Sequence, residues 1–335
     1  MRVKLIGIYA VLITANLLVW LWALLAFDQY PLLLGTSFLA YSFGLRHAVD
    51  ADHIAAIDNV TRELMQQGKQ PVGLGFFFSL GHSTVVVLAA AGIALTAGAL
   101  QNHFEPLKEV GSLISTSVSA AFLFAVALAN MFILVALCRT FRELRRSGHF
   151  VDEELSVFLS RRGLLGRLLR PLFRVIGTSW HMYPLGLLFG LGFDTATEIG
   201  LLGVSAAEAS KGLSIWSIMV FPALFTAGMS LVDTTDSVLM VCAYGWAFVK
   251  PVRKLYYNVT VTAVSVLVAV IIGGIEVLGL VGSQLGLEGS FWSVITALND
   301  NFGTLGYVII AIFAASWVTS MAIYRLKGYD KIEPA

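Results

Sequence analysis

The chain has 335 residues, of which 57% are hydrophobic and 13% are charged, and its formal net charge is +1. A soluble domain typically carries about 25% charged residues, so this chain has too few of them to cover its surface in water. This composition excludes a soluble protein and predicts no nucleic-acid partner, and it indicates an all-α polytopic membrane protein. Its two cysteines, Cys138 and Cys242, are too few for a disulfide framework.

Eight apolar segments follow one another along the chain, and each has about the 20 residues needed to cross a bilayer. No small-residue cleavage site follows the first segment, so we expect it to be a retained helix rather than a signal peptide. The predicted spans are 5–26, 32–59, 72–98, 112–138, 181–204, 214–246, 258–286 and 302–324. Together they form one transmembrane domain that covers residues 1–335.

Positive charges test this topology, because Lys and Arg accumulate in cytoplasmic loops. With the N-terminus in the cytoplasm, 19 of the 22 Lys and Arg residues fall on the cytoplasmic side, Arg62 after the second span among them. We therefore predict that both termini are cytoplasmic. A basic cytoplasmic loop, 139–180, separates the two halves; its amphipathic part fits either a helix on the anionic inner leaflet or a solvated connector.

The second span holds the densest group of ionisable residues. Each such residue inside a bilayer costs about 2.5–3.5 kcal/mol, so these residues are candidates for function. On a regular helix, His47, Asp50 and His53 share one face, whereas Asp52 points elsewhere unless the helix is unwound. Imidazole together with carboxylate suits Ni²⁺, Co²⁺ or Zn²⁺. The alternative is a buried salt-bridge network around Arg46.

Three further spans carry ionisable residues at membrane depth. In the fifth span Asp194 and Glu198 share a helix face, and in the sixth span Asp233 and Asp236 do so. Two carboxylates on one buried face repel each other unless a cation, a proton or Arg46 lies between them. We therefore predict that these four residues line the path of a cation. His82 in the third span fits either a metal ligand or a hydrogen-bonded core residue.

The two halves of the chain contain a weak internal repeat. A shift of about 146 residues places Phe-Gly-Leu at 43–45 on Phe-Gly-Leu at 189–191, and the segment 78–83 then meets 225–230. The shift covers three spans, so the two copies run through the membrane in opposite directions. That is the inverted repeat of many secondary transporters, in which the substrate binds between the repeats at the midplane. We predict repeats of spans 2–4 and 5–7 around one shared site.

These motifs closely resemble those of the nickel/cobalt transporter (NiCoT) family. The family signature His-x4-Asp-His is matched within residues 47–53, and its three other motifs are matched at 74–83, 191–198 and 228–236. The four motifs occur in the right order and span the whole predicted architecture, which makes the resemblance specific.

The resemblance implies a permease for high-affinity import of Ni²⁺ or Co²⁺ across the bacterial inner membrane. Such a protein is not an enzyme and needs no prosthetic group, since the metal ion is its substrate. The resemblance also implies that His47, Asp52 and His53 matter most, whereas the argument from the helix face prefers Asp50 to Asp52. Asp52 is then either a direct ligand or a residue that orients a histidine.

The sequence contains no Gly-x4-Gly-Lys-Ser/Thr loop for ATP. We therefore predict secondary transport without an ATPase subunit, since the membrane potential supplies about 4.6 kcal/mol to a divalent ion per 100 mV. One alternative is an exporter of the same metals, but such proteins often have a His-rich cytoplasmic loop and this loop has only His149. A second alternative, an intramembrane metallohydrolase, typically shows His-Glu-x-x-His, which the sequence lacks.

Overall fold

The computed structural model describes residues 2–96, 101–147, 177–191, 196–247 and 251–326, and within these residues every regular element is a helix. The helices in chain order are α1 (Arg2–Ala26), α2 (Pro31–His47), α3 (Ala51–Gln66), α4 (Leu74–Thr96), α5 (Gln101–Ser147), the 3₁₀ helix η1 (Ser179–His181), α8 (Met182–Phe189), α9 (Ala196–Ser210), α10 (Ile215–Ile218), α11 (Val220–Ala247), α12 (Pro251–Gln284), α13 (Ser290–Asn299) and α14 (Phe302–Leu326). The prediction of an all-α fold is confirmed.

Five segments are long and apolar enough to cross a membrane, and a bent pair of helices makes a possible sixth. The five segments are Arg2–Ala26, Leu74–Leu95, Ser112–Phe132, Ile215–Gly245 and Val259–Gln284. The bent pair, Ser290–Asn299 with Phe302–Ser316, turns by 76°. These six agree with the first, third, fourth, sixth, seventh and eighth predicted spans, so the chain is a multi-pass membrane protein.

The second and fifth predicted spans are broken helices. The second stops at His47 and resumes at Ala51, because Asp50 adopts an extended backbone with φ −63° and ψ 147°. In the fifth, α8 ends at Phe189 and a turn follows at Gly190 and Leu191; α9 begins at Ala196, and residues 192–195 between them lie outside the described part of the chain. Non-helical backbone is tolerated at membrane depth only where protein or a polar cavity surrounds it, and the residues of the first break are buried. Of the two possibilities that the sequence left open for the second span, a regular helix and an unwound one, the structure has the interrupted helix.

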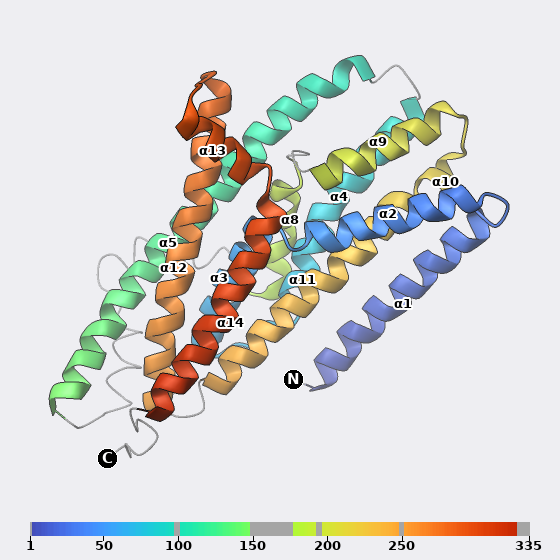
Figure 1. Cartoon of the computed structure of the whole chain (residues 1–335). Coiled ribbons are helices and arrows are strands. Elements are labelled where there is room, and N and C mark those ends of the chain that lie inside the picture. Colours follow the sequence, from blue (N-terminus) through green and yellow to red (C-terminus); the bar gives the residue numbers. More distant parts are fainter. Residues whose placement is uncertain (1, 97–100, 148–176, 192–195, 248–250, 327–335) are drawn as a thin grey trace.

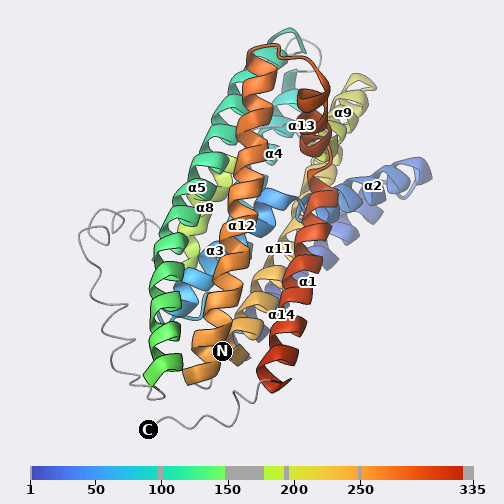
Figure 2. The same ribbon diagram turned by 60° about the vertical axis from the view of Figure 1, so that its left-hand side comes forward.

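The broken helices lie among the long ones (Figures 1 and 2). On one side α5, α12 and α14 run side by side, and α3 packs against α12, α14 and α11. On the other side α4 packs against α8, α9 and α11, and α2 crosses α11 and α9. The break between α2 and α3 therefore lies in the interior of the bundle, where neighbouring helices cover its backbone.

Arg62 is not a loop residue, although the charge pattern placed it in one. It lies within α3, and its side chain is 0% exposed. The sequence around it is polar and reads as the end of a span, but α5, α11 and α12 pack around α3 and bury it. Of the predicted loop 139–180, residues 148–176 lie outside the described part of the chain.

Helix α4 approaches its neighbours so closely that two of its positions require glycine. A Cβ atom at Gly81 would overlap the backbone carbonyl of Tyr183 in α8, and one at Gly75 would overlap the backbone carbonyl of Asp233 in α11. Small residues allow membrane helices to pack backbone against backbone in this way. The contacts fix His82, the residue after Gly81, relative to α8 and α11.

We expect Gly81→Ala to destabilise the folded protein by about 1–3 kcal/mol or more, since the added methyl group meets backbone that has no room to move. Thermal unfolding in detergent measures this loss. Gly92→Ala in the same helix is the matched control, because a Cβ atom there meets nothing within 4 Å. Because alanine has a higher helix propensity than glycine, we expect Gly92→Ala to leave the stability of the protein equal or slightly higher. Equal unfolding temperatures for the two variants would contradict the packing argument.

Candidate metal site

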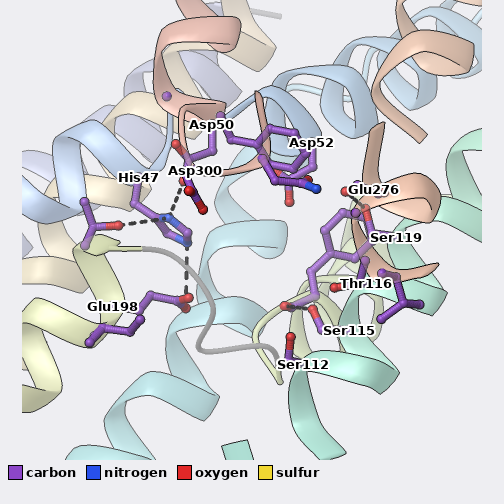
Figure 3. A pocket seen from close by; sticks show the side chains of 18 of the residues that line it. His47, Asp50, Asp52, Ser112, Ser115, Thr116, Ser119, Glu198, Glu276 and Asp300 are labelled. Atoms are coloured by element: carbon purple, nitrogen blue, oxygen red, sulfur yellow. Dashed lines mark hydrogen bonds and ion pairs between the residues drawn. The ribbon is translucent and has the colours of Figure 1, made fainter. Parts of the chain in front are cut away.

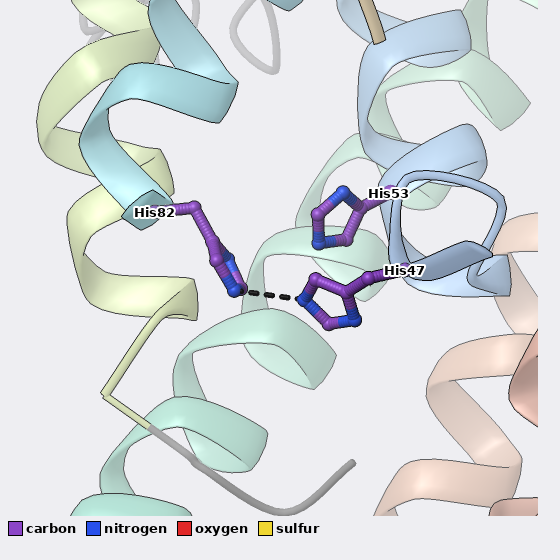
Figure 4. Close-up of side chains that lie close together, drawn as sticks. All are labelled: His47, His53 and His82. Carbon is purple, nitrogen blue, oxygen red and sulfur yellow. Dashed lines mark hydrogen bonds between the residues drawn. The ribbon is translucent and has the colours of Figure 1, made fainter. Parts of the chain in front are cut away.

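Three buried histidines from three helices converge in the middle of the bundle (Figure 4). His47 is the last residue of α2, His53 lies in the first turn of α3, and His82 lies in α4. Their side chains are only 0–3% exposed, and one ligand nitrogen from each lies within 4.8 Å of the others. Imidazole nitrogens are the preferred protein ligands of Ni²⁺, Co²⁺ and Zn²⁺.

The ring nitrogens face one another. Nε2 of His47 lies 2.9 Å from Nε2 of His82, and Nε2 of His53, which has no hydrogen-bond partner among the described residues, points toward the same space (Figure 4). Two nitrogens that bind one metal at about 2.1 Å and at right angles are about 3.0 Å apart. The spacing of His47 and His82 therefore suits a shared metal ion.

Two aspartates lie behind the histidine rings. Oδ2 of Asp50 is 2.7 Å from Nδ1 of His47, and Oδ1 of Asp233 is 3.4 Å from Nδ1 of His53. A carboxylate in this position accepts a hydrogen bond from Nδ1–H, which keeps the ring proton on Nδ1 and leaves the lone pair of Nε2 free for a metal ion. Asp50 and Asp233 are therefore placed to orient the two histidines rather than to bind the metal themselves.

Glu198, at the start of α9, lies near the Nε2 atoms of His47 and His82, whereas Asp50 and Asp233 lie near Nδ1 atoms. Its Oε1 is 2.9 Å from Nε2 of His82 and 3.8 Å from Nε2 of His47. The side chain is 1% exposed. Glu198 can therefore add one carboxylate oxygen to the three nitrogens, which gives a mixed set of ligands suited to a divalent transition metal.

The break between α2 and α3 decides which residues meet. The helix-face argument expected His47, Asp50 and His53 to line one side of a regular helix. Instead, the extended backbone at Asp50 turns the chain, so that His47 comes from the end of one helix and His53 from the start of the next. The His53 side chain then points from α3 toward α4, where His82 lies (Figure 4).

A cavity of about 900 Å³ leads to this site. Figure 3 shows His47 and Glu198 on one wall and the hydroxyl groups of α5 on the wall opposite. Glu276 of α12 and Asp300, between α13 and α14, also line it. Five acidic side chains and one arginine, Arg46, line the cavity, so the acidic side chains outnumber the basic one and the cavity can admit a hydrated cation to the histidines.

Among the described contacts, neither Asp52 nor Asp236 forms a side-chain hydrogen bond with one of the three rings. Asp52 lines the cavity, next to Asp50 in the chain. Asp236 is on α11, almost one turn beyond Asp233, and its Oδ2 atom is buried and has no hydrogen-bond partner among the described residues. Asp194 falls within residues 192–195, which lie outside the described part of the chain.

Sequence reasoning passed over several buried ionisable residues. Glu276 is 3% exposed and accepts a hydrogen bond of 2.7 Å from Ser119. It is the one acidic residue in the apolar segment 258–286, and the high cost of a carboxylate in such a segment marks it as a candidate functional residue. Asp58 and Arg62 are both 0% exposed, although sequence reasoning assigned no role to Asp58 and the charge pattern placed Arg62 in the loop after the second span.

The chain was compared with known proteins. A family model named NicO and described as a high-affinity nickel-transport protein matches residues 33–323. A high-affinity nickel transport protein of Cupriavidus necator is 59% identical over 99% of this chain and 95% of its own length. The nickel transporter NicT of Mycobacterium tuberculosis is 46% identical over 97% of this chain and 89% of its own length. The cobalt transport protein NhlF of Rhodococcus rhodochrous is 43% identical over 88% of this chain and 84% of its own length. No solved structure matches.

Proposed function

Because this chain belongs to the NicO family of high-affinity nickel-transport proteins, we propose that it imports Ni²⁺ or Co²⁺ through the membrane. Members of this family are transporters, so the chain is not an enzyme and the metallohydrolase alternative is dropped. The metal ion is the substrate of the protein. We keep the prediction that the chain needs neither a prosthetic group nor an ATPase subunit.

The observation that carries the proposal is the buried group of three histidines at the end of a polar cavity. In the proposed cycle, a hydrated metal ion enters the cavity, where carboxylates attract it. It loses water molecules to the nitrogens of His47, His53 and His82 and to Glu198, whose ligand atoms already lie close together. A movement of the bundle then releases it on the other side of the membrane.

We assign different roles to the other predicted site residues. Asp50 and Asp233 orient histidines, as their distances to the Nδ1 atoms suggest. Asp52 belongs to the cavity that the ion crosses first. We keep Asp194 and Asp236 in the proposed path because each shares a span with a second carboxylate, Glu198 and Asp233 respectively. Two carboxylates buried side by side in a membrane are costly unless a cation lies near them.

The proposed architecture keeps eight membrane segments and the inverted repeat of spans 2–4 and 5–7. The two interrupted spans support the repeat, because the helices that follow the interruptions begin at Ala51 and at Ala196, 145 residues apart and close to the shift of about 146 residues. Interrupted segments in matching places of two halves are typical of transporters whose substrate binds between inverted repeats. The whole chain, 1–335, then forms one transporter domain with 139–180 as the loop between its halves.

We place the chain in the bacterial inner membrane with both termini in the cytoplasm. The excess of Lys and Arg in the loops on that side supports this orientation. The beginning of α1 and the end of α14 also lie toward the same end of the bundle (Figures 1 and 2). The cavity is lined by the N-terminal half of α5, by the C-terminal end of α12 and by α13. These parts lie at the end of the bundle opposite to the termini (Figures 1 and 2), so in this orientation the cavity opens to the outside.

Accumulation of radioactive nickel and cobalt by metal-starved bacteria tests the proposal. Cells that express the chain should accumulate more of at least one metal than cells with an empty vector, and excess Mg²⁺ should not abolish the uptake, since Mg²⁺ prefers oxygen ligands. Cells that hold less metal than the control would show that the chain is an exporter. No difference in either direction would contradict nickel and cobalt transport.

A further inference from the structure

A second buried polar group lies farther along α3, and the transport site does not use it. Tyr244 of α11 donates a hydrogen bond to Asp58, and Ser265 of α12 donates a second one at 2.7 Å. One turn farther, Arg62 donates to Thr262 of α12 at 3.2 Å.

Asn59 links this group to another helix. Its Oδ1 atom accepts hydrogen bonds of 3.0 Å from Arg62 and 3.0 Å from Asn130 of α5. We call the seven residues the α3 network; they are Asp58, Asn59, Arg62, Asn130, Tyr244, Thr262 and Ser265. Six of them are 0% exposed and Tyr244 is 5% exposed. The network therefore joins α3 to α5, α11 and α12 through buried side chains.

The α3 network and the cavity lie on opposite sides of the histidines. Asp58 follows His53 by five residues of helix, or about 7.5 Å. Along α5, Asn130 lies 11 residues beyond Ser119, which lines the cavity, or about 16 Å farther. Among the described residues that line the cavity, none belongs to the network. The cavity thus reaches the histidines from one side, and the network fills the bundle on the other.

The charge of Arg62 suits a barrier to cations. Its guanidinium is 0% exposed, and its Nε atom has no hydrogen-bond partner among the described residues. Asp58, one turn away on the same helix, is the nearby opposite charge. A fixed arginine within a membrane pathway repels cations. A divalent ion that has reached the histidines therefore meets a positive charge and closed packing on the inner side.

We propose that the α3 network is the inner gate of the metal pathway, held shut by the hydrogen bonds to Asp58 and guarded by the charge of Arg62. Release to the cytoplasm then requires that α3 separate from α11 and α12 along these bonds. The inference rests on the proposed transport function, because a gate needs a pathway. Beyond the transport function, the inference states where the pathway is closed and which residues close it.

Labelling of single cysteines tests the gate without measuring transport. In a chain whose two native cysteines, Cys138 and Cys242, are replaced by alanine, Thr61→Cys reports on the network and Ser283→Cys on the cavity. Thr61 is 0% exposed and lies between Asn59 and Arg62, whereas Ser283 is exposed and lines the cavity. A membrane-impermeant thiol reagent is added to right-side-out and to inside-out vesicles.

Ser283→Cys should react from one side only, and Thr61→Cys should react slowly from both. Adding Tyr244→Phe and Ser265→Ala removes both donors to Asp58 and should raise the labelling rate of Thr61→Cys at least about tenfold, only from the side opposite to Ser283→Cys. An unchanged rate, or an equal increase from both sides, would overturn the gate. The result does not depend on which metal is carried, so failure of the gate and failure of metal transport are distinguishable.

A second measurement isolates the charge. In liposomes that contain the purified protein and a trapped metal-sensitive dye, we expect Arg62→Gln to raise the slow passive entry of Co²⁺ at least about tenfold. Arg62→Lys, which keeps the charge, should stay near the unsubstituted protein. Equal entry in the two variants, whether low or high, would overturn the role of the charge.

Discussion

Replacing His53 by alanine is expected to reduce nickel accumulation to the level of cells that carry an empty vector. His53 supplies one of three imidazoles that meet in a site where the side chain is 0% exposed. A metal ion gives up water molecules only where protein ligands replace them, and the truncated site offers no nitrogen in that place. The loss should exceed the roughly 10–100-fold that removal of an orienting partner costs a metal site.

The measurement compares cells with matched amounts of transporter in their membranes. His181→Ala is the matched control, because this histidine lies in η1, where its ring accepts a hydrogen bond of 3.0 Å from the backbone of Gly177. The control should transport like the unsubstituted protein. If His53→Ala retained more than half of the accumulation, the three histidines would not form the binding site.

Asp50→Asn is expected to raise the nickel concentration for half-maximal uptake about 10–100-fold. Oδ2 of Asp50 lies 2.7 Å from Nδ1 of His47, and when Nδ1 carries the proton of the neutral ring the carboxylate accepts a hydrogen bond from it. An asparagine can instead offer its N–H₂ group to Nδ1, which moves the proton of the neutral ring to Nε2. The same exchange of tautomers disables the histidine of a serine protease when its aspartate becomes asparagine. His47 would then present an N–H to the metal ion in place of a lone pair.

Asp52→Asn is the informative comparison, because both aspartates line the cavity but only Asp50 has a hydrogen bond to the His47 ring among the described contacts. It should weaken uptake by removing a charge that attracts the ion, and that effect should shrink as the ionic strength rises. The loss in Asp50→Asn should persist at high ionic strength, because it follows from the state of a buried ring. Identical salt dependence in the two variants would contradict separate roles for Asp50 and Asp52.

The roles proposed for these two aspartates would account for the disagreement between the two lines of sequence reasoning. The family signature includes Asp52, whereas the helix-face argument preferred Asp50. We propose that both belong to the pathway, Asp50 behind a ligand and Asp52 in the cavity. A helical wheel cannot express this division, since it assumes a regular helix through the segment that contains the break.

The sequence by itself determined the membrane character, the all-α class, the family and the segments that hold the metal ligands. These features follow from composition and from local residue patterns. Charge is too scarce for a surface in water, and ionisable residues such as His47 and His82 are too costly in a bilayer to stand there without a function. The match of four motifs then selected nickel and cobalt among the possible cations.

Only the tertiary structure decided which of these residues meet and which atoms they present. His82 joins His47 because α4 packs closely on its neighbours through glycine, and His53 joins them because the backbone at Asp50 leaves the helix. The polar stretch that contains Arg62 is buried because three other helices surround it. Local patterns carry no information on such contacts, since burial and side-chain direction depend on segments far away in the sequence.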